Sequence, residues 1–254
     1  MAHGAPLLAI EENDYTSFLS SVRDRFSRPK AIVLFSAHWE SQVEMVSHAE
    51  NYSTIYDFYG FPEELYHIQY PAKGDPSLAK SVHDLLQDHG IESQADFERG
   101  LDHGAWVILK HLYPEADIPV ISMSVNSRLT PEEQYRIGKA LAPLREEDIL
   151  IIGSGGTVHN LRAVDFKKGP SEVDRWAFEF DQWLENEILS WNLEALFSYR
   201  EAAPYADLAV PLYGTEHFVP IFYAMGAADS TKQAQLLYRS YIYGNLSYSV
   251  WQFD

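Results

Sequence analysis

The chain has 254 residues, of which 46% are hydrophobic, and this is enough to build the core of one large α/β domain or two small ones. Its formal net charge of −18 argues against partners such as nucleic acid or an anionic membrane, because both need a cationic surface. The sequence contains no cysteine, which excludes disulfides, thiolate metal sites and cysteine nucleophiles.

Apolar runs and amphipathic stretches alternate along the chain. Three short apolar runs bounded by turn residues predict buried strands, and the stretches between and after them predict helices. Near the C-terminus, two strands are expected to meet at Gly244-Asn245. In chain order we predict a strand at 31–36, a helix at 75–90, a strand at 118–125, a helix at 130–144, a strand at 149–152, a helix from about Ser171 to 189, and the two final strands within 239–253.

Capping residues mark two of the predicted helices. Asp75 and Pro76 suit the N-cap and the first helical position of one of them, and Gly90 suits its end. Thr130 and Glu133 have the spacing of a capping box. Strands alternating with helices predict an α/β fold, in which helices flank both faces of a central, mainly parallel or mixed sheet. We expect a single domain over residues 1–254, with ligands bound beyond the carboxyl ends of the strands.

Five of the ten histidines lie where such a sheet would place a functional site. His38 follows the first buried strand in "AIVLFSAHWES", and His159 follows another strand through the glycine-rich turn of "ILIIGSGGTVHN". His3, His103 and His217 lie in "AHGAP", "GLDHGAW" and "GTEHFVP". Each histidine alone could be an ordinary capping residue. Gathered at one edge of a sheet, neutral imidazoles suit Fe(II), Zn(II) or another borderline divalent ion.

The spacing of several motifs adds a resemblance to a known family. "HGAP", "SAHWE", "YDFYGFP", "GLDHGAW", "GSGGTVHN" and "EHFVP" occur in this chain in the order seen in the 4,5-DOPA extradiol dioxygenase family. That family is a branch of the class III extradiol ring-cleaving dioxygenases. The resemblance extends from His3 to about Gly226, and it implies one catalytic domain of this class.

The resemblance also implies roles for the five histidines. His3, His38 and His217 would bind the catalytic metal, which is Fe(II) in the active form, although Zn(II) often occupies such sites in isolated protein. His159 matches the acid/base histidine and could bind as a fourth ligand in a resting or zinc form. His103 would be a second catalytic histidine that hydrogen-bonds the bound oxygen or the substrate.

Further residues next to these motifs are candidates for supporting roles. Glu216, Glu40 and Asp102 are adjacent in sequence, or nearly so, to the proposed histidines, and we expect them to hydrogen-bond those side chains. Tyr59, in the aromatic segment "NYSTIYDFYGFP", and Tyr213, in "PLYGTEH", are expected to contact the ring of the substrate.

The N-terminus departs from the family pattern. Relatives carry a short apolar strand ahead of the first His-Gly pair, whereas this sequence begins Met1-Ala2-His3. A metal ligand on a frayed terminus would bind its metal poorly. We therefore expect either that residues upstream of Met1 complete a first strand or that this strand is absent.

The favoured function is metal-dependent extradiol cleavage of a catechol, L-DOPA-like or another aromatic diol, by O2 with insertion of both oxygen atoms. One alternative is a zinc-dependent hydrolase on the same fold, with Glu40, Asp102 or Glu216 as its base; a zincin-type enzyme is disfavoured because the sequence has no HExxH motif. Another is a non-catalytic relative that binds metal or ligand. The sequence lacks an apolar run of transmembrane length and a secretory signal pattern. We expect a cytoplasmic protein, which could form a homo-oligomer.

Overall fold

A mixed β-sheet forms the centre of the molecule in the computed structural model, which describes residues 1–169 and 172–254. Within these residues the sheet has the strand order β3-β2-β4-β1-β5, and all neighbours are parallel except β2 and β4. Its strands are β1 (Ala31–Glu40), β2 (Glu44–Ser47), β3 (Ser93–Asp96), β4 (Val120–Val125) and β5 (Ile149–Ser154). The predicted α/β class is confirmed, with β2 and β3 added to the predicted strands.

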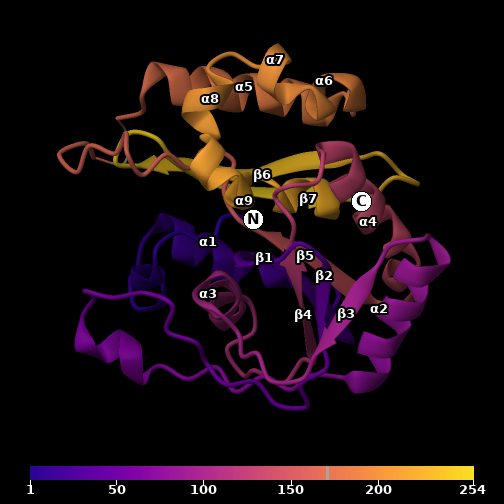
Figure 1. Cartoon of the computed structure of the whole chain (residues 1–254). Coiled ribbons are helices and arrows are strands. Elements are labelled where there is room, and N and C mark those ends of the chain that lie inside the picture. Colours follow the sequence, from indigo (N-terminus) through magenta and orange to yellow (C-terminus); the bar gives the residue numbers. More distant parts are fainter. Residues whose placement is uncertain (170–171) are drawn as a thin grey trace.

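Helices cover both faces of this sheet (Figure 1). The α-helices are α1 (Asp14–Val22), α2 (Pro76–Asp88), α3 (His103–Leu112), α4 (Pro131–Ala140), α5 (Arg175–Leu189), α6 (Leu193–Phe197), α7 (Tyr199–Ala202), α8 (Ala206–Ala209), α9 (Thr215–Phe218) and α10 (Pro220–Gly226). Shorter 3-10 turns are η1 (Pro6–Ala9), η2 (Arg23–Arg25), η3 (Glu63–His67), η4 (Ala142–Glu147) and η5 (Leu212–Gly214).

Alternation along β1 divides the core between the two faces. Ile32 and Leu34 pack with α1 and α3 on one face, whereas Val33 and Phe35 pack with α2, α4 and α10 on the other. Successive side chains of a strand point to opposite faces, so a strand buried on both sides must be apolar at every position. This explains why the run 31–35 contains no polar residue.

A second layer lies against this α/β body. The antiparallel hairpin of β6 (Ala234–Ile242) and β7 (Leu246–Phe253) is sandwiched between the body and helices α5 to α8 (Figure 1). The predicted hairpin turn at Gly244-Asn245 is confirmed, and Gly244 has the positive φ of 87° that favours glycine. The predicted start of the long helix near Ser171 lies outside the described residues; α5 begins at Arg175, with Asp174 as its N-cap.

The first strand is longer than its apolar run suggests. The predicted strand ends at Ser36, but β1 continues to Glu40, so His38 lies within the strand and not beyond it. The pairing of β1 with β4 is interrupted after Phe35 and resumes only at Glu40. This irregular stretch frees His38 from a regular ladder position at the carboxyl end of the sheet.

No regular strand precedes β1 in the described residues, yet the N-terminal residues are hydrogen-bonded to their neighbours and are not frayed. Ala2 forms a parallel bridge with Gly155, directly after β5. The Met1 amine donates to the Gly153 carbonyl at 2.6 Å, and the Ala2 N–H donates to the Ser249 carbonyl of β7 at 2.9 Å. Burial lowers the pKa of the Met1 ammonium to about 5. His3 therefore extends from a held backbone.

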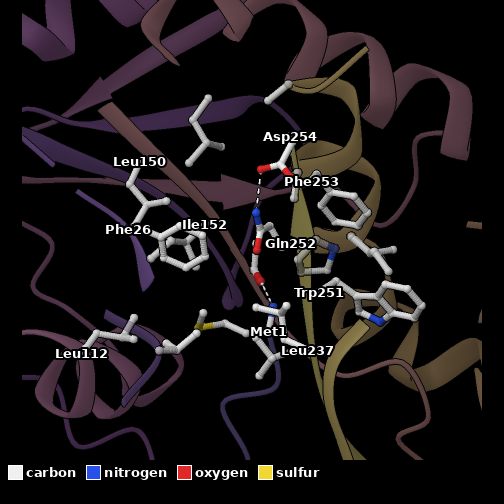
Figure 2. A pocket seen from close by; sticks show the side chains of 18 of the residues that line it. Met1, Phe26, Leu112, Leu150, Ile152, Leu237, Trp251, Gln252, Phe253 and Asp254 are labelled. Carbon is white, nitrogen blue, oxygen red and sulfur yellow. Dashed lines mark hydrogen bonds between the residues drawn. The ribbon is translucent and has the colours of Figure 1, made fainter. Parts of the chain in front are cut away.

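A cavity of about 390 Å³ opens beside Met1, between β5 and β7 (Figure 2). Its lining is largely apolar and includes Phe26, Leu150, Ile152 and Trp251. Of the five histidines described below, His217 alone is among its described lining residues. Within the described part of the chain, no helix combines the length and the apolar composition needed to cross a membrane.

Candidate active site

Five histidines from separate parts of the chain converge at the carboxyl end of the sheet. His3 follows the N-terminal residues held beside β5, and His38 lies near the end of β1. His103 is the first residue of α3, His159 lies in the loop after β5, and His217 lies in α9. The predicted gathering of these side chains is what the structure shows.

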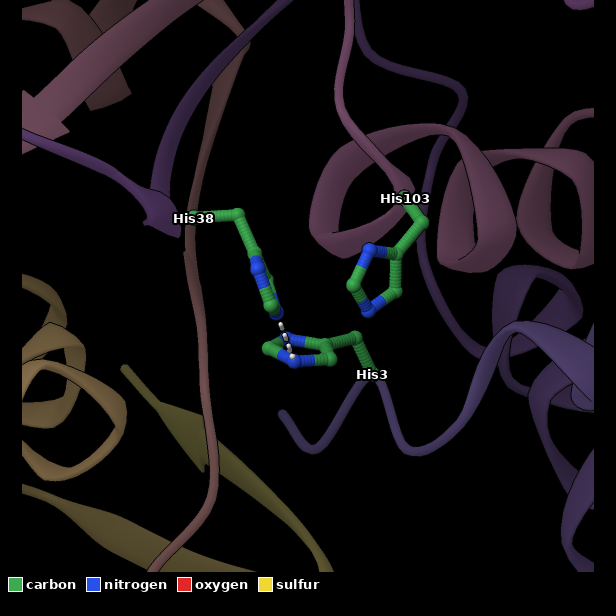
Figure 3. Close-up of side chains that lie close together, drawn as sticks. All are labelled: His3, His38 and His103. Atoms are coloured by element: carbon green, nitrogen blue, oxygen red, sulfur yellow. Dashed lines mark hydrogen bonds between the residues drawn. The ribbon is translucent and has the colours of Figure 1, made fainter. Parts of the chain in front are cut away.

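Three of these histidines form a compact group. The ligand atoms of His3, His38 and His103 all lie within 4.8 Å of one another, and their rings point toward a common centre (Figure 3). His38 Nε2 is 3.0 Å from His3 Nε2. His3 and His103 are buried, whereas His38 is partly exposed. Such a group of imidazoles could hold a metal ion.

His217 and His159 lie next to this group. The His217 ring centroid is 5.2 Å from that of His3 and 5.0 Å from that of His38. The His159 ring stacks on His217 at 3.8 Å. The ligand set of His3, His38 and His217 thus stays a prediction, because the structure also places His103 close enough to bind.

Hydrogen-bond partners select the nitrogen that each imidazole can offer to a metal. His3 Nδ1 is 3.1 Å from Ser154 Oγ, and His217 Nδ1 is 2.9 Å from Glu216 Oε1. A partner at Nδ1 leaves Nε2 with the lone pair that a metal needs. Glu216 thus has the supporting position expected of it.

The Asp57 carboxylate lies close to two histidines. Its Oδ2 is 3.3 Å from His38 Nδ1, its Oδ1 is 3.0 Å from His103 Nδ1, and the backbone N–H of His103 donates to Oδ1 at 2.9 Å. Burial works to raise the pKa of Asp57, but its contacts with His103 and His38 outweigh burial and lower that pKa to about 2. Sequence analysis missed this residue, although it is the one acidic position in "YDFYGFP".

Burial holds four of the imidazoles, those of His3, His38, His159 and His217, in the neutral form. Burial, followed by the charge of neighbouring histidines, lowers the pKa of His38, His159 and His217 to about 3. The same causes lower the pKa of His3 well below its ordinary value. Neutral imidazole is the form that binds a metal, so the residues present fit a borderline divalent cation.

Asp102 connects the segments that carry His38 and His103. It caps α3 through the N–H of Ala105, accepts a hydrogen bond from Ser36 Oγ at 2.6 Å, and pairs with Arg99 at 3.1 Å. Arg99 also donates to the His38 carbonyl at 3.0 Å. Asp102 therefore positions the backbone around both histidines, and its carboxylate is fully engaged in doing so.

Two glycines allow these segments to approach closely. A Cβ at Gly104 would lie 2.8 Å from Ser36 Oγ and 2.9 Å from His38 Cδ2. A Cβ at Gly155 would lie 2.0 Å from the carbonyl oxygen of His217. Larger residues at either position would push apart the elements that carry the histidines.

The loop that carries His159 is held from the hairpin layer. Thr157 Oγ1 donates to the buried carboxylate of Asp181 at 2.8 Å, and Ser247 Oγ donates to the other oxygen of that carboxylate at 2.6 Å. Asn160 N–H donates to Asn245 Oδ1 at 3.2 Å. Sequence analysis did not identify Asp181 or Asn245, since both are far from His159 in the chain.

Three other predicted residues have different surroundings. Glu40 is exposed, and its carboxylate accepts a hydrogen bond from Ser127; it contacts no histidine in the described residues, because it lies where β1 has already returned to its pairing with β4. Tyr59 is 92% exposed, and its neighbour Phe58 is the one that contacts the His103 ring, at 5.8 Å. The Tyr213 hydroxyl donates to Asn160 Oδ1, one residue after His159.

Comparison with known proteins identifies the family. Residues 1–251 match the family described as the catalytic LigB subunit of aromatic ring-opening dioxygenase. The chain is 42% identical to the 4,5-DOPA dioxygenase extradiol of Beta vulgaris and 41% identical to that of Mirabilis jalapa, over 100% and 99% of this chain and 94% of each relative. A crystal structure of an uncharacterized protein from Escherichia coli K12 matches with a TM-score of 0.80 and 32% identity, over 94% of this chain and 92% of that one. This chain belongs to the family of catalytic LigB subunits of aromatic ring-opening dioxygenases and is therefore an oxidoreductase.

Proposed function

We propose that this chain catalyses the extradiol cleavage of a catechol by O2, with both oxygen atoms entering the ring-opened product. The observation that carries the proposal is the group of neutral imidazoles around His3 and His38, whose Nδ1 partners leave Nε2 available to a metal. Relatives named 4,5-DOPA dioxygenase extradiol, which match this chain over 94% of their own length, support a catechol such as L-DOPA as the substrate.

His3, His38 and His217 would hold the metal, Fe(II) in the active form. The resemblance noted in the sequence favours His217 as the third ligand, and the hydrogen bond of its Nδ1 to Glu216 fits that role. When bound, Fe(II) supplies Lewis acidity and one-electron chemistry to both the catechol and O2. Zn(II) would fit the same imidazoles in isolated protein without supplying the redox step.

His159 is the proposed acid/base residue. Its neutral imidazole can accept a proton from a catechol hydroxyl, and it can later return that proton to the oxygen that leaves in O–O cleavage. Its loop donates hydrogen bonds to Asp181, from Thr157, and to Asn245, from the Asn160 N–H, and these hold it in place. His103, next to Asp57, would hydrogen-bond the oxygen or the substrate, and Phe58 would contact the aromatic ring.

The carboxylates near the histidines support this activity over a zinc hydrolase. A hydrolase needs a carboxylate that is free to activate water. Asp57 and Glu216 each contact the Nδ1 of a histidine, and Asp102 is occupied by Ser36, Arg99 and the start of α3.

The test is anaerobic reconstitution with Fe(II), followed by oxygen-electrode and absorbance measurements with L-DOPA and simple catechols. We expect uptake of one O2 per catechol and a new visible absorbance from the ring-opened product. His159→Gln should abolish both signals, whereas His89→Gln, which alters an exposed histidine at the end of α2, should leave them unchanged. Ester or amide hydrolysis by zinc-loaded protein, without oxygen uptake from any catechol, would contradict the proposal.

A further inference from the structure

An exposed arginine, Arg162, lies in the loop that carries His159, beside the segment that leads into the helix of His217. The Arg162 guanidinium stacks over the Tyr213 ring, with Cζ 3.9 Å from the ring centroid. Arg162 follows His159 by three residues, and Tyr213 precedes His217 by four. The His159 and His217 rings stack on each other, so this cation–π pair is a second contact between the same two segments.

Asn160 fixes this pair relative to His159. Its Oδ1 accepts hydrogen bonds from the Tyr213 hydroxyl at 2.9 Å and from the Arg162 backbone N–H at 3.1 Å. Asn160 is itself held by Asn245 and by the Leu208 carbonyl. The Arg162 side chain therefore starts from an ordered backbone, and its position is coupled to that of the acid/base histidine.

The positive charge of Arg162 is not neutralised by an ion pair within the described part of the chain. Other arginines near the site are paired, Arg99 with Asp102 at 3.1 Å and Arg200 with Asp207 at 3.3 Å. Among residues 1–169 and 172–254, no carboxylate forms an ion pair with Arg162, although the chain has 37 acidic and only 19 basic residues. The protein is acidic overall, so it would repel an anionic substrate. An exposed arginine stacked on an aromatic ring would instead attract a carboxylate of the substrate locally.

Exposed apolar side chains are next to Arg162 and Tyr213 in the sequence. Leu161 is 59% exposed, Leu212 is 80% exposed and Tyr213 is 50% exposed. The segments that follow His159 and precede His217 thus expose hydrocarbon together with one positive charge. A catechol whose diol faces the histidines would direct its ring substituent outward, and a short hydrocarbon chain ending in a carboxylate has the matching chemistry.

We propose that Arg162 is a specificity-determining residue, which binds a carboxylate on the side chain of the catechol substrate. The inference rests on the proposed function, because it takes the diol end of the substrate to be held at the histidines. It predicts that the enzyme prefers anionic catechols, such as hydrocaffeate, over 4-methylcatechol, which has the same ring and no charge.

The test compares Arg162→Gln with Arg162→Lys and with Arg25→Gln. Arg25 is exposed in η2, so its replacement removes the same charge away from the site. In the Fe(II)-reconstituted enzyme we expect Arg162→Gln to raise the KM for hydrocaffeate about tenfold while changing kcat/KM for 4-methylcatechol less than twofold. Arg162→Lys should raise the KM for hydrocaffeate less than Arg162→Gln does, because it keeps the positive charge. Arg25→Gln should have the same KM as the wild type.

A binding measurement separates this inference from the proposed function. Anaerobic calorimetric titration of the zinc-loaded protein with the two catechols needs no turnover. If Arg162→Gln weakens binding of hydrocaffeate alone, the inference holds even if oxygen uptake fails and the proposed activity is rejected. If the variant weakens both catechols equally, or neither, the inference is overturned whether or not the enzyme cleaves catechols.

Discussion

The imidazole rings of His159 and His217 stack face to face, with centroids 3.8 Å apart and planes inclined by 9°. His217 is fixed through Nδ1 by Glu216, whereas His159 is fixed through its backbone, which donates to the Ala209 carbonyl at 3.1 Å. The His217 ring is thus held by its own hydrogen bond, whereas the His159 ring forms no side-chain hydrogen bond with another residue in the described part of the chain. This difference suits a metal ligand beside an acid/base residue.

Replacement of His159 should separate catalysis from metal binding. We expect His159→Gln to lower kcat by about 10²- to 10⁴-fold, the usual contribution of a positioned proton-transfer group. Its metal content, measured by atomic absorption after reconstitution, should stay close to that of the wild type. A variant that loses its metal along with its activity would show that His159 is an essential ligand.

The third metal ligand can be decided by a matched pair of variants. His103→Ala and His217→Ala each remove one imidazole from the neighbourhood of His3 and His38. We expect His217→Ala to lose most of the bound metal and His103→Ala to retain it while losing activity. The reverse pattern of metal content would assign the third position to His103, as its close grouping with His3 and His38 allows.

Asp57 should matter almost as much as the histidines it contacts. Asp57→Asn keeps the size of the side chain but removes the charge that faces His38 and His103. We expect metal affinity or activity to fall about 10- to 100-fold, as is common when a partner of metal-binding histidines is lost. Competition with a chelator measures the affinity. Asp84→Asn, on an exposed turn of α2, is the control and should have no effect.

The metal-free protein should lose stability on acidification. In the folded protein the pKa values of His38, His159 and His217 are lowered to about 3. In the unfolded chain a histidine side chain has a pKa of about 6.5. Between these values the unfolded state binds more protons, so the free energy of unfolding falls as pH falls from about 7 toward 3. Urea denaturation at several pH values measures this slope. A flat profile between pH 7 and pH 5 would contradict the burial of neutral imidazoles.

Glu44 should have the opposite pH dependence. Burial raises its pKa to about 8, while a hydrogen bond from the Tyr223 hydroxyl acts weakly the other way. The folded state then binds more protons than the unfolded state between about pH 4.5 and 8, so this group costs stability as pH rises through that window.

Glu44→Gln removes this cost while keeping an oxygen for Tyr223. We expect its melting temperature to exceed that of the wild type by a margin that grows from pH 5 to pH 8. Glu92→Gln removes an exposed carboxylate next to β3 and should show no such trend. A margin that stays constant across this range would mean that Glu44 does not titrate with a raised pKa.

Local patterns in the sequence determined the sheet and part of the site. The run 31–35 had to be a buried strand because it is apolar at every position, and parallel strands carry residues at their carboxyl ends to one edge. From these two patterns we predicted that His38 and His159 lie at the same edge of the sheet. The glycines around His103 and after β5 were visible as well, although the close contacts that require them were not.

Only the tertiary structure decided which residues support the histidines. Asp57 lies 46 residues before His103, and Asp181 lies 24 residues after Thr157, so no periodicity connects them. The pairing of Ala2 with Gly155 likewise spans most of the chain and holds a terminus that the sequence suggested would fray. Such contacts depend on how helices and strands pack, because burial selects a polar partner by its distance in space and not by its distance in sequence.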